Sequence, residues 1–323
     1  MLAIQVDQPG GPEVLKVADL PVPVCGPDQL LVELAFSGVN FIDIYQRQGI
    51  YPMPSPYVPG LEGSGIVVEV GSAVNGFSAG DKVAWPSSLG SYSQVHAVNA
   101  VSVVKVPDGV SLDVACAAML QGMTAHYLIA SLYEVKPGDT ALVHAAAGGV
   151  GQLLCQMISS RGATVIGTAS TSEKAEIARQ AGASHVIRYD TEDVASKAKE
   201  LTNGIGVDVV YDGVGLATFD GSLASLKRRG MMALFGGASG MVPPFDLQAL
   251  SRMGSLFVTR PTLADYIVGP GEMQWRADEI FAEHLAGKLN FAIGNTYALK
   301  DATTAHTDLA ARKTTGKLLL VTK

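Results

Sequence analysis

Short apolar runs separated by turn residues make up about the first 120 positions of the chain. The segments at 30–39, 65–71, 81–86 and 102–107 run apolar or alternate with polar residues, between glycines and prolines. Short strands divided by such turns are typical of barrels and other all-β folds. We therefore expect a compact β-barrel-like domain in this part of the chain.

From about residue 111 the pattern changes to strands that alternate with helices. An apolar helix is expected at 112–130, and further helices at stretches such as 171–182 and 218–230. The apolar runs that predict strands are 140–145, 164–169, 185–189, 207–215, 230–237 and 255–260. This alternation predicts an α/β domain with a doubly wound, parallel sheet of about six strands.

The C-terminal tail is expected to return to the first domain. Helices are predicted near 277–288 and 303–313, joined by a polar connection, and a last strand at 317–323. We therefore divide the chain into a first domain, 1–120 completed by 264–323, and a second domain, 121–263, inserted in it.

A glycine turn follows the first strand of the second domain. Gly148, Gly149 and Gly151 carry no Cβ, so the backbone there can turn tightly and approach a ligand. The helix that follows offers unpaired N–H groups and the positive end of its dipole to an anion. Ala146 stands where the usual G-x-G-x-x-G has its first glycine. The order of strand, turn and helix predicts a site for a dinucleotide pyrophosphate.

The end of the second strand indicates which nicotinamide cofactor binds. NAD sites commonly place an acid there to hold the ribose hydroxyls. Here the strand ends in residues 169–172, Ala-Ser-Thr-Ser, and the first acid is Glu173. Without a carboxylate to repel a 2′-phosphate, and with Lys174 near it, the pattern favours NADPH over NADH.

Charge and composition exclude other kinds of partner. The net charge is −7 and no run of more than three Lys or Arg residues occurs, so no nucleic acid is expected. We see neither a signal-peptide pattern nor an uninterrupted apolar run of roughly 18 residues, so no membrane is expected. The three cysteines, Cys25, Cys116 and Cys155, are far apart, which indicates a reduced, cytoplasmic compartment.

The glycine turn also resembles a family signature. Its residues Gly138, Asp139, Leu142, Ala146–Gly149, Gly151, Gln156 and Ser159 are similar to those of one branch of the medium-chain dehydrogenase/reductase superfamily, the quinone oxidoreductases and zeta-crystallins. Residues 10–17, 40–51 and 70–83 resemble the same branch, so the similarity covers essentially the whole chain. NFIDIY (40–45) and FVTRP (257–261) are most similar to the bacterial NADPH:quinone reductases. The resemblance implies a GroES-like domain, a Rossmann domain and a cleft between them.

The resemblance implies an enzyme without zinc. Zinc-dependent relatives carry a Cys, a His in a G-H-E motif, a further Cys and a four-Cys lobe. The corresponding positions here are Asn40, Leu61 and Gln121, and the lobe is missing. Zinc needs three or four N, S or carboxylate ligands, so we expect no metal.

Cofactor contacts are also implied by the resemblance. Lys174, Tyr189 and Arg312 match positions that contact the adenosine phosphate end. Ser170 replaces a family glycine, and its hydroxyl can also donate to a phosphate. The other implied contacts are Asp43, Thr124, Tyr127, Ala147, Gly148, Gly149, Val150, Gly151, Phe235 and Arg260. Arg260 can equally cap a helix or serve a dimer.

The predicted loop at 40–51 supplies the candidate catalytic residues. Asn40 and Tyr45 can donate hydrogen bonds to a quinone oxygen as negative charge grows on it. Tyr51 can cap the pocket or contact the cofactor. For Asp43 a purely structural role is equally possible, because Asp often stabilises a loop through hydrogen bonds to the backbone.

The resemblance implies an NADPH:quinone reductase whose partner is a quinone or another small electrophilic acceptor. Hydride and one-electron transfer both stay open. A related chemistry is reduction of an enoyl or 2-alkenal double bond, and a different class is a cofactor-binding protein with little turnover.

A homodimer is expected through the strand near Ser255–Arg260. An apolar strand at the end of a sheet invites pairing with another chain, commonly a second copy. Shielding of this edge by the C-terminal helix is the alternative.

Overall fold

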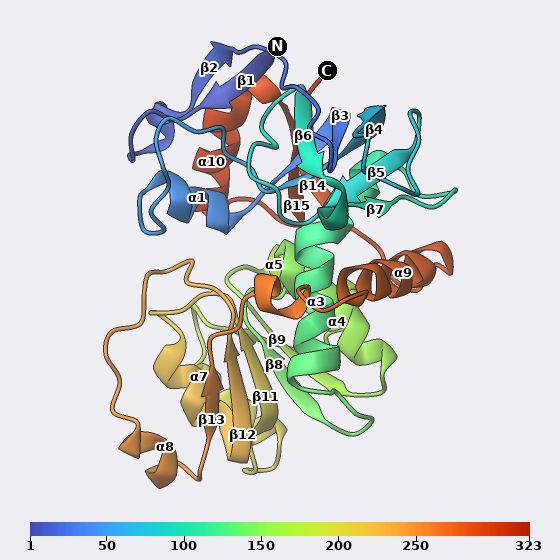
Figure 1. Cartoon of the computed structure of the whole chain (residues 1–323). Coiled ribbons are helices and arrows are strands. Elements are labelled where there is room, and N and C mark those ends of the chain that lie inside the picture. Colours follow the sequence, from blue (N-terminus) through green and yellow to red (C-terminus); the bar gives the residue numbers. More distant parts are fainter. The chain divides into compact units, whose positions relative to one another are not determined.

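The computed structural model describes all 323 residues, which divide into two compact units (Figure 1). The first unit is Met1–Met123 with Pro270–Leu285 and Phe291–Lys323. The second unit is Thr124–Gly269 with Ala286–Asn290. Each has its own sheets and its own core.

A seven-stranded sheet forms most of the first unit. Its order is β14-β15-β3-β4-β5-β7, with β6 paired to β3. The strands are β3 (Gln29–Val39), β4 (Glu62–Val70), β5 (Lys82–Trp85), β6 (Val95–Asn99), β7 (Val104–Lys105), β14 (Ile293–Ala298) and β15 (Lys317–Val321). Because β15 pairs antiparallel with β3, the last strand of the chain completes the sheet of the first. All sheet pairs except β14–β15 are antiparallel.

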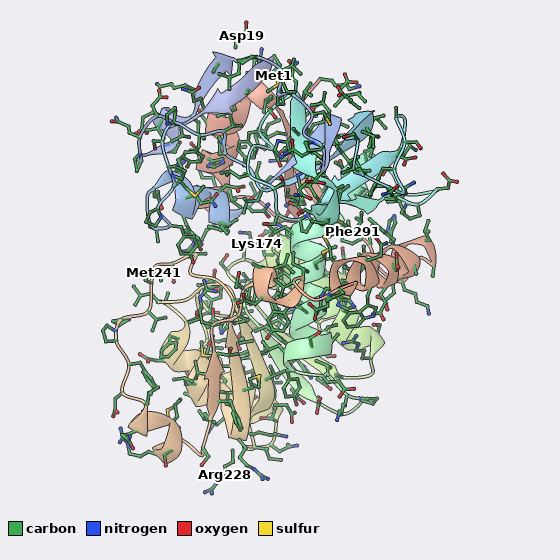
Figure 2. All side chains as sticks on the ribbon, viewed as in Figure 1. Met1, Asp19, Lys174, Arg228, Met241 and Phe291 are labelled. Carbon is green, nitrogen blue, oxygen red and sulfur yellow. The ribbon has the colours of Figure 1, made fainter.

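A hairpin and short helices complete the first unit. The hairpin is β1 (Leu2–Gln5) with β2 (Lys16–Asp19), and the amino group of Met1 donates to Asp19 Oδ1 over 2.9 Å (Figure 2). The helices are η1 (Pro12–Val14), α1 (Phe41–Arg47), η2 (Ala100–Ser102), α2 (Leu112–Ala117), η3 (Ala118–Gly122), α9 (Glu272–Leu285), η6 (Leu299–Asp301) and α10 (Ala302–Ala310). Two apolar clusters fill this unit, one around Trp85 and Leu34 and one around Tyr92 and Leu318.

The segment at 41–47 is a helix, and its interpretation as a loop was wrong. Asp43 Oδ2 accepts the backbone N–H of Asn40 over 2.8 Å, which ties off the residue before the helix. This hydrogen bond, which we expected to stabilise a loop, therefore stabilises the first turn of α1.

A six-stranded, all-parallel sheet forms the second unit and confirms the predicted Rossmann-type domain. Its order is β10-β9-β8-β11-β12-β13. The strands are β8 (Thr140–Val143), β9 (Thr164–Ala169), β10 (His185–Arg188), β11 (Val207–Asp212), β12 (Leu226–Leu234) and β13 (Phe257–Thr259). The strand order reverses between β8 and β11, and open α/β sheets bind ligands at such a reversal.

Helices lie between these strands, as the alternation predicts, and also before the first strand and after the last. They are α3 (Met123–Tyr127), η4 (Leu128–Leu132), α4 (Gly149–Ser160), α5 (Ser172–Gln180), α6 (Val194–Leu201), α7 (Phe219–Ser225), α8 (Gln248–Arg252) and η5 (Leu263–Tyr266). The helix predicted at 218–230 was too long, because α7 ends at Ser225. Leu226 is extended, 4% exposed and paired with Val207, so burial in the sheet decides its conformation.

One helical stretch, Leu112–Leu132, is long and apolar enough to cross a membrane by length and composition. In the structure 72% of its most apolar window is buried within the protein. That burial is typical of a core helix in a folded domain.

Polar side chains join the carboxyl ends of three strands in the second unit. Ser222 Oγ donates to Asp212 Oδ2 over 2.7 Å, so His144 Nε2 must donate to Ser222 Oγ over 3.0 Å. Burial lowers the pKa of His144, so the ring is neutral and its Nδ1 accepts from Thr168 Oγ1 over 3.2 Å. Thr168 Oγ1 in turn accepts the N–H of Ala145. This chain fixes the backbone directly after β8.

A second buried polar group lies in the first unit, around Tyr92. Its hydroxyl donates to Asp43 Oδ2 over 3.0 Å and lies 3.0 Å from His306 Nε2. Burial lowers the pKa of His306 to about 3, with Arg47 as a smaller cause. Burial also raises the pKa of Asp43 to about 7. The two groups therefore affect stability in opposite directions as the pH falls.

We predict that His306→Gln changes the pH dependence of unfolding. Below the ordinary pKa of 6.5 the unfolded chain binds a proton at His306 that the folded protein does not. The free energy of unfolding therefore falls by up to about 1.4 kcal/mol for each pH unit of acidification, and the variant loses this slope. Asp43 opposes it, because the folded protein binds its proton between its ordinary pKa of 3.8 and about 7, where the unfolded chain does not.

Urea denaturation between about pH 6 and 4 measures this slope. His185→Gln, on the exposed surface of β10, serves as the control and keeps the wild-type slope. An unchanged slope in His306→Gln would contradict the assignment.

Candidate functional site

The turn between β8 and α4 leaves no room for a side chain at its closest point. Ala145 has φ 50°, and the N–H of Gly148 donates to Ala145 O over 2.8 Å. A Cβ on Gly151 would lie 2.3 Å from Ala145 O, a separation that real Cβ atoms do not have. Only glycine therefore lets α4 begin this close to the end of β8.

This turn fits a phosphate group. Gly148 precedes α4 and no side chain caps the helix, so the first N–H groups of α4, at Gly149, Val150 and Gly151, lack a capping acceptor. A helix N-terminus of this kind binds anions. Ala147, only 4% exposed, contributes its carbonyl, which accepts a hydrogen bond from Gln152 Nε2 over 2.8 Å and steadies the turn.

Three predicted adenosine-side residues lie close together at the ends of β9 and β10. Ser170 follows β9, and Lys174 (labelled in Figure 2) lies in the first turn of α5. The N–H of Tyr189 donates to Ala169 O over 3.3 Å, which brings Tyr189, half exposed, beside the end of β9. Arg312, the fourth predicted residue, belongs to the first unit and follows α10 with φ 55°.

Arg188 is a second cation in this region that sequence reasoning missed. Its Nη1 donates to Ser172 Oγ over 2.6 Å, and its Nη2 contacts Asp190 Oδ2, also at 2.6 Å. Its place as the last residue of a parallel strand was the available signal, because such strand ends face the ligand side of the sheet.

The loops after β11 and β12 approach each other closely. Phe235 donates its backbone N–H to Asp212 O over 2.9 Å, and its ring lies against Gly213. A Cβ on Gly236 would lie 2.5 Å from Gly213 O. Phe235 is therefore held at the carboxyl edge of the sheet, on the same edge as the glycine turn.

The remaining predicted cofactor contacts of the second unit are more enclosed. Thr124 and Tyr127 are 8% and 1% exposed, and the Tyr127 ring stacks on Tyr266 with centroids 4.3 Å apart. Arg260 directly follows β13 and donates from Nη1 to Pro261 O over 3.2 Å. The surroundings of Tyr127 are those of a packed aromatic side chain.

Tyr45 and Tyr51 lie together in the first unit. Their rings meet edge to face with centroids 5.6 Å apart, and the N–H of Tyr51 donates to Tyr45 O over 3.2 Å. Both side chains are partly exposed. The two residues therefore reach the surface of this unit.

Asp43 has a different role from the predicted cofactor contact. Its side chain is fully buried, and Oδ2 accepts from both the Asn40 N–H and the Tyr92 hydroxyl. Such a carboxylate does not reach a cofactor at the surface of the unit. This geometry agrees with a purely structural role for Asp43.

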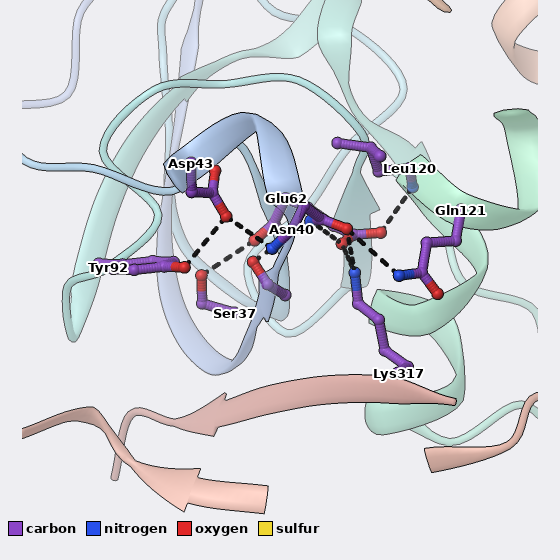
Figure 3. Close-up of polar contacts among 9 residues, drawn as sticks. Ser37, Asn40, Asp43, Glu62, Tyr92, Leu120, Gln121 and Lys317 are labelled. Atoms are coloured by element: carbon purple, nitrogen blue, oxygen red, sulfur yellow. Dashed lines mark hydrogen bonds and ion pairs between the residues drawn. The ribbon is translucent and has the colours of Figure 1, made fainter. Parts of the chain in front are cut away.

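Asn40 is the centre of a buried network that contains two opposite charges (Figure 3). Its Nδ2 donates to Glu62 Oε2 over 2.9 Å and to Gly38 O over 3.4 Å. Its Oδ1 accepts from Lys317 Nζ over 2.8 Å and from Gln121 Nε2 over 3.4 Å. Asn40 is 4% exposed, so its predicted donation to a quinone oxygen disagrees with the geometry, because both amide hydrogens are already used inside the protein.

Glu62 and Lys317 were missed as functional candidates. Lys317 Nζ forms an ion pair with Glu62 Oε2, and the two side chains are 2% and 0% exposed. A single lysine at the start of the apolar run 317–321 was the only signal in the sequence. No group of three or more His, Cys, Asp or Glu side chains that could hold a metal ion occurs in the structure.

Comparisons with known proteins agree with this architecture. Residues 26–131 match the family described as alcohol dehydrogenase GroES-like domain, and residues 149–282 match the family described as zinc-binding dehydrogenase. A quinone oxidoreductase of Pseudomonas aeruginosa is 45% identical over 320 residues, which is 98% of each chain. A 2-haloacrylate reductase of Burkholderia sp. is 41% identical, with 99% of each chain covered.

A solved structure is similar over the whole chain as well. The quinone oxidoreductase of Escherichia coli, solved in complex with NADPH, superposes with a TM-score of 0.97 at 42% identity, covering 99% of this chain and 100% of that one. With this likeness over both units, the chain belongs to the quinone oxidoreductase family of the medium-chain dehydrogenase/reductase superfamily.

Proposed function

We propose that this protein reduces quinones with NADPH and without a metal ion. The observation that carries the proposal is the turn in which Gly151 lies against Ala145 O and the start of α4 is left without a cap. Such a turn holds the pyrophosphate of a dinucleotide. The NADPH complex of the E. coli relative supports the choice of cofactor.

We assign the cofactor's two phosphate regions to different residues. The amides of Gly149, Val150 and Gly151 would bind the pyrophosphate at the start of α4. Ser170 and Tyr189, directly after β9 and β10, and Lys174 in the first turn of α5 would bind the 2′-phosphate, with Arg188 close by. Thr124, Phe235 and Arg260 are the further proposed contacts.

When bound, NADPH supplies reducing equivalents from its nicotinamide ring. The phenol hydroxyl of Tyr45 would hold a proton at the acceptor oxygen as negative charge grows there, and Tyr51 would orient the acceptor beside it. Asn40 and Asp43 act inside the protein, where they fix the start of α1.

The Asn40 network supports a site without metal. The amides of Asn40 and Gln121 stand at positions where zinc-dependent relatives carry cysteines, and the Glu62 carboxylate is already paired with Lys317. Neutral amides and an ammonium group are poor ligands for zinc.

We further propose a cytoplasmic homodimer joined through β13. This strand lies at the edge of its sheet and pairs with β12 alone. Phe257 and Val258 remain 56% and 36% exposed, which suits an edge that a second copy covers. The three cysteines are free, as in a reduced compartment.

Reduction of a conjugated double bond is the second candidate. The 41% identity with the 2-haloacrylate reductase favours it. Hydride addition to such a bond leaves an enolate that must gain a proton, so this chemistry depends on a proton donor more strongly than quinone reduction does.

NADPH consumption with p-benzoquinone tests the proposed function, with NADH in parallel. We expect turnover with NADPH, and we expect Lys174→Ala to raise the KM for NADPH about tenfold, because one charged phosphate contact is lost. The KM for NADH stays unchanged. Lys199→Ala, an exposed lysine on α6, is the matched control. No oxidation of NADPH across a panel of quinones and enals would overturn the proposal.

Tyr45→Phe separates the two chemistries. We expect quinone reduction to fall by less than about tenfold, and reduction of a 2-alkenal to fall by a factor of about 100 or more, because the enolate loses its proton donor. Both rates are measured on one preparation at saturating NADPH. An equal loss for both substrates would contradict the assigned role of Tyr45.

Val258→Asp tests the dimer. A carboxylate on the paired edge would be buried without a partner, so we expect the variant to be monomeric by light scattering. Val268→Asp, at a residue 78% exposed in the same unit, is the control and leaves the mass unchanged. A monomeric wild-type chain at micromolar concentration would refute the dimer.

A further inference from the structure

The ion pair between Lys317 and Glu62 is fully enclosed in the first unit (Figure 3). Removing two charges from water is costly, and their attraction compensates only when their remaining hydrogen bonds are satisfied. Here both charged groups have several hydrogen-bond partners. Glu62 Oε1 accepts the N–H of Leu120 over 2.5 Å, and Glu62 Oε2 accepts from both Asn40 Nδ2 and Lys317 Nζ.

The two charges fix which way the Asn40 amide points. Its carbonyl oxygen faces the Lys317 ammonium, and its NH₂ group faces the Glu62 carboxylate. A flipped amide would place its NH₂ against the cation and its oxygen against the anion. Both contacts would then be repulsive, so one orientation is selected strongly.

The backbone is built around this contact. A Cβ on Gly38 would lie 2.0 Å from Glu62 Oε2 and 2.8 Å from Lys317 Nζ, so only glycine leaves room for the pair. Ser37 Oγ donates to the backbone oxygen of Glu62 over 3.0 Å. The end of β3 is thereby tied to the start of β4 at the charges.

The network also holds the start of α1. Asn40 is the residue that precedes the helix, and an Asn there usually turns its side chain onto the first helical N–H groups. Here the side chain is also held by Lys317 and Glu62, while Asp43 secures the backbone N–H of Asn40. Tyr45 lies on the same short helix, so its place depends on this anchor.

We propose that Lys317 is a positioning residue for the reduction: its ammonium group, paired with Glu62, locks the Asn40 amide and so fixes α1 with Tyr45 in its working place. The role given to Tyr45 rests on the proposed function. The hold of Lys317 on α1 is a property of the first unit alone and can be measured separately.

Two variants separate positioning from simple stabilisation. Lys317→Met leaves the Glu62 carboxylate buried without its cation, so we expect a marked fall in melting temperature. In Lys317→Met/Glu62→Gln both charges are gone, and we expect most of the melting temperature to return. Lys323→Met/Glu33→Gln is the matched control, because it removes an exposed ion pair between the last residue of the chain and β3.

The double variant is then compared with wild type by three measurements. Amide hydrogen exchange over residues 40–47 is expected to speed up, because the anchor of α1 is lost. The Kd for NADPH, measured by fluorescence without any acceptor, is expected to stay within about twofold. The kcat for p-benzoquinone is expected to fall by roughly threefold to tenfold, no more than in Tyr45→Phe, with the KM for NADPH unchanged.

A double variant with restored melting temperature, wild-type exchange in α1 and wild-type kcat would overturn the proposal and leave the pair a structural role only. Faster exchange with an unchanged kcat would also overturn it, because α1 would then be anchored by Lys317 without serving the reduction. If the wild-type enzyme fails to reduce any quinone, the proposed function fails, and wild-type exchange in the variant would still refute the hold on α1.

Discussion

The close approach of α4 to the end of β8 is the constraint on which the cofactor site depends. Ala145 takes a left-handed backbone conformation, and Gly151 lies where any side chain would meet Ala145 O. The His144–Ser222–Asp212 chain holds the backbone on the strand side of this turn. The sheet, the turn and the helix start thus form one rigid support for an anion.

The first unit is stabilised differently, because it encloses the oppositely charged side chains of Glu62 and Lys317. Asp43 and Glu62 are both fully enclosed, and each accepts a hydrogen bond from Asn40, one from its backbone and one from its side chain. An amide between a cation and an anion is oriented without any metal. In this chain Asn40, which matches a zinc-ligand position of the zinc-dependent relatives, lies in a polar network at the start of α1.

Local patterns predicted most of the fold and the phosphate turn. The strand, the glycines and the helix of the cofactor turn follow one another in the sequence, so residues 140–160 alone predict their arrangement. The segment at 40–47 was misread because an Asp three residues after an Asn suits a loop and a helix start equally well. Leu226 was misread because burial against Val207 overrides its helical neighbours. The pairing of Glu62 with Lys317 joins residues 255 apart, and no local pattern carries it.

Calorimetric titration of NADPH into the protein tests the central claim most directly, since that claim concerns binding at the turn after β8. We expect saturable binding of one NADPH per chain, and weaker binding of NADH because its 2′-hydroxyl offers Lys174 no charge. Absence of binding by both nucleotides would contradict it.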